Sequence, residues 1–247
     1  MRSTLVLAAL IAAVGAHAQQ PEQAQQIDPL ALNVLRTVLD PVKQAGTYSF
    51  HTRVSEERLA TNGQMITSVR EATATVSQPD RFRIDFQRAG RQIALIFNHG
   101  NVVLYAPAEK LYAKIAAPTT IEAALDRLEE RNIAFPTSNL FRRDPYASLS
   151  DDLTGAYVVR QTTLDGARVL QLAFTEPGAT WQVWVEDGAT PLPKRLEIVY
   201  LNRPGQPRVT VEFSDWKFGS VDPALFAFTP PPGAHEIQLL TLGTQGD

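Results

Sequence analysis

The sequence predicts a mainly β (α+β) protein with a single, strongly curved antiparallel sheet of about ten or eleven strands, whose concave face is covered by helices. Short segments with alternating apolar and polar residues recur through most of the 247 residues. Turn dipeptides such as Asn62-Gly63 and Asp165-Gly166 separate these segments at hairpin spacing. Strand and helix do not alternate as in βαβ units, and no linker or charge run divides the chain. Because a twisted sheet of this size tends to curl, a half-barrel is expected.

Residues 1–18 have the features of a cleaved signal peptide. Arg2 precedes an apolar stretch at 5–14, and Ala16-His17-Ala18 has the small-x-small form of a cleavage site. A membrane span needs about 20 apolar residues, and this stretch has about ten. No Cys follows it, so lipidation is not expected. The mature protein is therefore predicted to start at Gln19 in the periplasm, without a transmembrane segment.

The composition excludes several classes of protein. Without residues 1–18 the chain has 22 basic and 26 acidic residues, and this mild acidity argues against nucleic-acid binding. The absence of Cys rules out disulfides, thiolate zinc sites and thiol catalysis. No cofactor is expected.

The chain begins with a Gln-rich segment, 19–27, that we expect to be disordered, followed by a domain over 28–240. Asp28-Pro29 is a typical helix start, and an apolar stripe of Leu30, Val34, Val38 and Val42 leads to a stop at Gly46. Pro41 should kink this helix or end it early.

Strands are predicted from Thr47 onward. The first group covers about 47–54, 64–77, 81–86, 93–97, 102–105 and 110–115. Its clearest amphipathic member alternates Phe82, Ile84 and Phe86 with polar residues. The second group covers about 156–163, 167–174, a hairpin between Trp181 and Leu201, 208–216, and a last segment at 226–229. A disordered tail is expected at 241–247.

Two helices are predicted between these groups of strands. Thr119 and Glu122 suggest a capping box for a helix that runs to about Asn132. A second helix is expected from Ser138 to Leu149, broken near Asp144-Pro145. Each helix has one apolar stripe, so the helices should fill the inside of the curved sheet. An outer-membrane barrel is disfavoured, because it needs a uniformly apolar outer face and its turns do not carry capped helices.

Three motifs resemble the superfamily of periplasmic carriers of outer-membrane lipoproteins (LolA-like). They are Gln78-Pro79-Asp80-Arg81-Phe82, the segment from His99 to Pro107, and Phe226-Ala227-Phe228-Thr229-Pro230-Pro231-Pro232-Gly233. The hairpin that starts at Trp181 and the segment 143–147 look closer to a sub-branch of predicted periplasmic proteins of unknown function. The resemblance implies an incomplete barrel whose hydrophobic cavity is closed by helices. Gln78 stands where the carriers have an Arg that governs binding and release, whereas Phe82 matches an aromatic that lines their cavity.

Twelve apolar side chains are predicted to share the concave face and to line a ligand cavity. They are Phe82, Ile84, Phe86, Leu95, Phe97, Trp181, Val183, Leu196, Ile198, Tyr200, Val211 and Phe213. An ordinary core filled by the helices is the alternative, and periodicity does not separate the two. A chain of about 16 carbons, at roughly 0.8 kcal/mol per buried CH₂, gains on the order of 12 kcal/mol before ordering costs. A lipid therefore needs no charged anchor.

Polar residues give no catalytic or metal-binding motif. His51, His99 and His235 lack the spacing of paired metal ligands. The acidic pairs 56–57, 129–130 and 151–152 are typical of solvated faces. Arg53, Arg81 and Arg83, on the polar side of neighbouring strands, can hold a phosphate or a partner, but such arginines are more often surface charges.

The sequence therefore favours a periplasmic binding or carrier protein, not an enzyme, whose partner is a lipid or a lipoprotein acyl chain. The alternative is an envelope sensor or adaptor that binds an envelope protein.

Overall fold

The computed structural model describes residues 26–88 and 90–239. Within them, twelve strands form one open sheet. The strands lie in the order β12-β6-β5-β4-β3-β2-β1-β11-β10-β9-β8-β7, and every adjacent pair is antiparallel except β12 and β6. The strands of the first half are β1 (Thr47–Leu59), β2 (Met65–Ser77), β3 (Arg81–Arg88), β4 (Arg91–Asn98), β5 (Asn101–Ala106) and β6 (Leu111–Ala116). The second half contains β7 (Gly155–Leu164), β8 (Ala167–Glu176), β9 (Ala179–Glu186), β10 (Pro193–Tyr200) and β11 (Arg208–Phe218).

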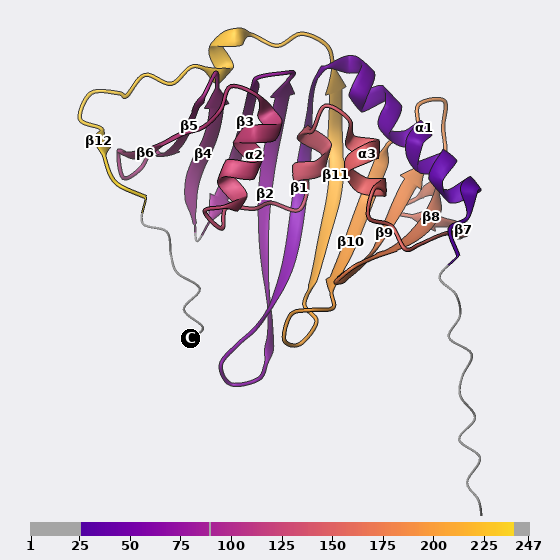
Figure 1. Cartoon of the computed structure of the whole chain (residues 1–247). Helices are drawn as coiled ribbons and strands as arrows, with labels where there is room; N and C mark the ends of the chain where they lie inside the picture. The colour runs from indigo at the N-terminus through magenta and orange to yellow at the C-terminus, as the bar shows by residue number, and fades with distance from the viewer. Residues whose placement is uncertain (1–25, 89, 240–247) are drawn as a thin grey trace, which may run out of the picture.

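The sheet consists of two meanders that meet at one pair of strands. β1 to β6 are joined by successive turns, and so are β7 to β11. The two halves meet where β1 pairs with β11, for example Val54 opposite Val211. The helices α1 (Pro29–Ala45), α2 (Ile121–Glu129) and α3 (Pro145–Ser150) lie over one face of the sheet, which we call the inner face (Figure 1). The predicted mainly β architecture, with helices against one face of a single sheet, is thus observed.

The leading helix α1 (Pro29–Ala45) has the predicted ends. The Asp28 side chain accepts a hydrogen bond from the Leu30 backbone N–H, and Gly46 has a left-handed φ of 63°. The prediction that Pro41 ends the helix early was wrong, because α1 continues to Ala45 and buries Val42 in its last turn.

The predicted signal peptide, residues 19–25 of the lead-in and the tail at 241–247 lie outside the described residues. At the end of the lead-in, Ile27 forms a bridge with Ala156 on β7, and the Gln26 carbonyl accepts a hydrogen bond from the Ala156 N–H.

Three short helices connect the two meanders. They are α2 (Ile121–Glu129), the 3₁₀ helix η1 (Ser138–Phe141) and α3 (Pro145–Ser150), and the break at Asp144-Pro145 is where it was predicted. The capping box was wrong by one residue: Thr120 caps α2, by accepting a hydrogen bond from the Ala123 N–H. The Glu122 side chain binds the backbone of Arg143 instead.

The C-terminal segment covers part of the opposite, outer face. After the 3₁₀ helix η2 (Pro223–Phe226) the chain crosses to β12 (His235–Glu236), and the predicted strand at 226–229 is irregular. Phe228 contacts the rings of Tyr105 and Tyr112, with centroids 5.1 and 5.3 Å apart. This cover is needed because β4 to β6 are apolar on both faces. Among the described residues, no helix has the length and apolar character to cross a membrane.

Candidate functional site

The inner face of the sheet is one continuous apolar surface. Neighbouring strands align their inward residues in rows, for example Phe50, Ala74, Ile84 and Leu95 across β1 to β4. All twelve side chains predicted to line a cavity lie on this face and belong to one cluster. Eight of them are buried, and Phe86, Leu196, Ile198 and Tyr200 are half-buried. Their role as ligand-binding residues remains a prediction.

Phe141 anchors the central helices to this face. We call residues 121–150, with α2, η1 and α3, the plug (Figure 1). The Phe141 ring is fully buried and lies 5.4 Å from Phe82 and 6.2 Å from Phe50, edge to face in both cases. Within the plug it also contacts Phe135 at 5.0 Å. Segments almost a hundred residues apart in sequence therefore meet at this one ring.

Two hydrogen bonds hold the plug to the sheet beside Phe141. The Tyr48 hydroxyl on β1 donates to the Leu140 carbonyl, and the Gln78 amide donates to the Phe141 carbonyl at 2.7 Å. Burial, aided by the Glu122 carboxylate, raises the pKa of Tyr48, so its hydroxyl stays protonated as a donor. We call Tyr48 and Gln78 the latch. Gln78, the residue that departs from the carriers' Arg, thus contacts the plug directly.

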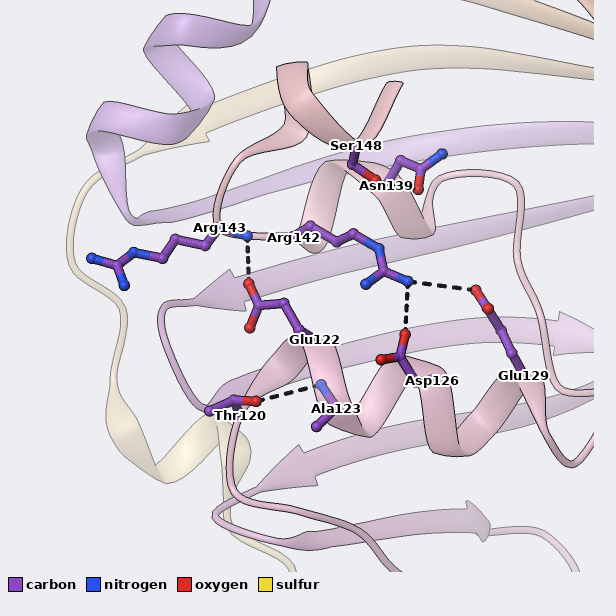
Figure 2. A network of polar contacts seen from close by, with 9 residues as sticks. All are labelled: Thr120, Glu122, Ala123, Asp126, Glu129, Asn139, Arg142, Arg143 and Ser148. Carbon is purple, nitrogen blue, oxygen red and sulfur yellow. Dashed lines mark hydrogen bonds and ion pairs between the residues drawn. The ribbon is translucent and has the colours of Figure 1, made fainter. Parts of the chain in front are cut away.

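Polar contacts on the solvent side join the parts of the plug to each other (Figure 2). The Arg142 guanidinium lies 3.0 Å from Asp126 Oδ1 and 3.9 Å from Glu129 Oε1, both on α2. The Arg143 backbone N–H donates to Glu122 Oε1 at 2.7 Å. η1 and α3 are joined by the Ser148 hydroxyl, which donates to Asn139 at 2.8 Å. These contacts make the plug one connected unit.

Contacts between α1 and α3 lie at the edge of the plug. Lys43 Nζ is 2.5 Å from Asp144 Oδ2, and the Arg36 guanidinium lies 4.2 Å above the Tyr146 ring. Both pairs are partly solvent-exposed, so each adds little stability. The plug is thus attached by the Phe141 anchor, the two hydrogen bonds of the latch, the buried apolar face of α2 and weak surface contacts.

The inner face continues on β10, where cover is incomplete. Leu196, Ile198 and Tyr200 point inward there, and none of them is fully buried. At the edge of this region, Glu56 and Arg70 form a 2.5 Å ion pair on the inward side of β1 and β2. A half-buried apolar strip therefore lies beside charged groups.

Glu176, at the inward end of β8, was missed by the sequence analysis. Burial raises the pKa of its carboxyl, and Asp152 adds to the effect. The Trp181 indole N–H faces the same carboxyl and lowers this pKa, although it makes no hydrogen bond of normal geometry. Burial and the charges of Glu56 and Glu176 likewise raise the pKa of Tyr200, against the lowering effect of Arg203.

The outer face carries two adjoining depressions of about 510 and 360 Å³ over β1 to β5. They share Glu71 and Gln87; the smaller one is lined mainly by polar residues, whereas the larger one has a mixed polar and apolar lining. Of the three candidate arginines, Arg83 pairs with Asp85 at 2.7 Å and Arg81 lies 3.4 Å from Asp80. Arg53 is exposed opposite Glu71 and Glu212. Each of the three arginines therefore lies beside a different acidic residue, and they do not form a common anion-binding site.

The three histidines lie on different elements of the fold. His51 lies on β1 beside Thr73, His99 lies in an exposed turn 3.0 Å from Asp80, and His235 is on β12. Within residues 26–88 and 90–239, no three His, Asp or Glu side chains form a metal-ligand group.

Comparison with known proteins gives one family match. A family model described as a predicted periplasmic protein (DUF2092) matches residues 31–240. No curated protein matches the sequence. The expected relation to predicted periplasmic proteins of unknown function is confirmed by the family match, and the expected periplasmic location agrees with its description.

Solved structures share the arrangement only distantly. An uncharacterized conserved protein from Thermus thermophilus is 14% identical over 83% of this chain and 99% of its own, with a TM-score of 0.48. LprF from Mycobacterium bovis is 14% identical over 85% and 99%, with a TM-score of 0.48. A LolA superfamily protein from Nitrosomonas europaea is 11% identical over 80% and 97%, with a TM-score of 0.41.

Proposed function

The chain belongs to this family of predicted periplasmic proteins (DUF2092), and from that premise we propose that it is a periplasmic carrier for a lipid or a single acyl chain. In this proposal the sheet serves as an incomplete barrel whose concave side is the inner face. The ligand lies between that face and the plug, and the protein shields it from water without changing it chemically. The observation that supports this most directly is the apolar strip on β10, whose inward side chains are only half-buried while most of the inner face is buried.

The physical argument concerns apolar surface that folding leaves partly exposed. Leu196, Ile198 and Tyr200 lie in adjacent inward positions of one strand, next to the buried Val183 and Val211. Covering such a strip with an alkyl chain gains roughly 25 cal/mol for each Å² of apolar surface removed from water. A hydrocarbon ligand therefore suits the strip, whereas a charged ligand would lose hydration there without a partner.

The plug is the part that we expect to move when the ligand enters. Its internal ion pairs keep it together, while Phe141, the latch and the buried apolar face of α2 attach it to the sheet. Pro41 lies in α1 beside the plug, and Pro145 begins α3 within it. Displacement of the plug would expose Phe50 and Phe82 to the ligand and enlarge the apolar site.

Native mass spectrometry of the mature protein, purified without detergent and followed by organic extraction, tests the proposal. Ile198→Asp places a charge on the inner face, and Val199→Asp places it on the outer face of the same strand. We expect a bound species of lipid mass in the wild type and in Val199→Asp, and its loss in Ile198→Asp. A wild type that is ligand-free, and that stays so after incubation with phospholipid or fatty acid, would show that the inner face is core only.

The smaller, polar depression of the outer face favours a second candidate function. Arg53, Glu71 and Gln87 there offer charged and polar groups to a folded protein, so the chain is then a sensor or adaptor that binds an envelope protein. A lipid-free protein that captures one envelope protein, and loses it in Glu71→Arg, would favour this function over the carrier.

A further inference from the structure

Two strand connections project beyond the helices at one end of the sheet (Figure 1). They are the end of the β1–β2 hairpin and the loop between β10 and β11, and we call residues 57–69 together with 201–208 the tip. The two connections are packed against each other. A Cβ atom at Gly205 would lie 3.1 Å from Met65 Sδ and 3.5 Å from Leu59, which shows how closely the two connections approach.

The tip carries apolar side chains that are exposed to solvent. Their exposed fractions are 37% for Leu59, 38% for Met65, 45% for Ile66, 52% for Val69 and 42% for Leu201. The strand register places Leu59, Met65 and Val69 on the outer side of the hairpin and Ile66 on its inner side. The apolar groups therefore surround the hairpin on both sides.

The charge of the tip is opposite to that of the whole chain. The tip contains three arginines, Arg58, Arg203 and Arg208, and one acidic residue, Glu57. The whole chain, in contrast, has a net charge of −3. Arg208 is also 3.6 Å from Glu197, and Arg203 lies over the Tyr200 ring at 3.8 Å. Arg58 is exposed beside Ile66, its partner across the hairpin.

We propose that the tip docks the protein onto the surface of a bilayer that contains anionic phospholipid. The apolar side chains dip between the headgroups, and the arginines bind lipid phosphates beside them. A flat protein partner covers only one side of a two-stranded hairpin, whereas lipid headgroups and acyl chains surround it on both. The combination of exposed apolar groups with a basic border is typical of interfacial membrane binding. This inference rests on the proposed function for its purpose, since a lipid carrier has to meet a membrane.

Co-sedimentation with vesicles tests the inference. We expect the protein to bind vesicles of phosphatidylcholine with added phosphatidylglycerol more tightly than pure phosphatidylcholine, and to be released as salt rises from about 0.05 to 0.5 M. Ile66→Asp should weaken this binding about tenfold, since it removes an apolar anchor and adds a like charge to the lipid. Ile237→Asp is the matched control, because Ile237 has the same exposed fraction of 45% but lies beside β12.

A second measurement uses the absence of Cys from the chain. A polarity-sensitive dye on Met65→Cys should shift to the blue on addition of the anionic vesicles, whereas the same dye on Ile237→Cys should not. Equal binding by Ile66→Asp and Ile237→Asp, or equal dye shifts at the two sites, would overturn the inference. Retention of a bound lipid in Ile66→Asp would at the same time leave the carrier function standing, so the two proposals fail separately.

Discussion

Phe141→Ala should loosen the plug while leaving the sheet folded. The substitution removes a fully buried ring that contacts Phe50 and Phe82 on the sheet. Truncation of a buried Phe to Ala typically costs about 3–5 kcal/mol. Because each 1.36 kcal/mol is tenfold in an equilibrium constant, the plug-open state should gain roughly two to four powers of ten in population relative to the closed state. Apart from the contact with Phe135 inside the plug, the lost contacts are those between the plug and the sheet, so the effect should be local.

Native-state hydrogen exchange at backbone amides measures this directly. Amides of α2 and α3 should lose far more protection than those of β1 and β11, which stay paired when the plug opens. Phe174→Ala is the control, because Phe174 is also buried, but it stacks on Trp181 at 4.0 Å within the sheet. It should lower the protection of β8 and β9 and leave the plug unchanged. An equal loss of protection in all elements of Phe141→Ala would refute the reasoning, since plug and sheet would then unfold as one unit.

Three further predictions concern single polar groups. Tyr48→Phe leaves the buried Leu140 carbonyl without its donor and should lower the unfolding free energy by about 1–3 kcal/mol, as measured by urea denaturation. For Glu176, burial raises the pKa, so the folded state binds the proton more tightly and stability falls as pH rises through the raised pKa. Glu176→Gln should therefore raise the Tm at neutral pH and not in acid, in a thermal melt monitored by circular dichroism, and an equal change at both pH values would contradict this. For Asp144, the hydrogen bond from Lys43 lowers the pKa first of all, and a bond from the Ala147 N–H adds to this, so its stabilisation is present at neutral pH and lost as pH falls through the lowered pKa. Asp144→Ala should cost about 0.5–1 kcal/mol at neutral pH, as for a weak exposed N-cap, and close to nothing in strong acid.

The sequence allowed the strands and their inward faces to be predicted because burial on one face imposes a period of two. Phe82, Ile84 and Phe86 show this period within a single strand, and their partners on β4 repeat it. The leading helix was predictable for a similar reason, since Asp28 and Gly46 satisfy its two ends locally.

The position of the plug was not predictable in this way. It depends on Phe141 meeting Phe50 and Phe82, and no local pattern connects segments so far apart in sequence. The role of Tyr48 was hidden because its ring fits the apolar alternation of β1, although its hydroxyl binds the plug. Glu176 is two residues after the inward-facing Phe174 on β8. The alternation of side chains along this strand would therefore have indicated that the Glu176 carboxyl points inward.

The junction between β1 and β11 has a consequence for the order of folding. Each meander is built from neighbouring hairpins, so its contacts are local and should form quickly. The β1–β11 pairing joins residues about 160 positions apart and closes the longest loop in the sheet. Until residues 208–218 have been synthesised and delivered, β1 presents an unpaired edge. The N-terminal meander alone is therefore the stage at which this chain is most exposed to edge-to-edge aggregation, and β11 ends that stage when it pairs with β1.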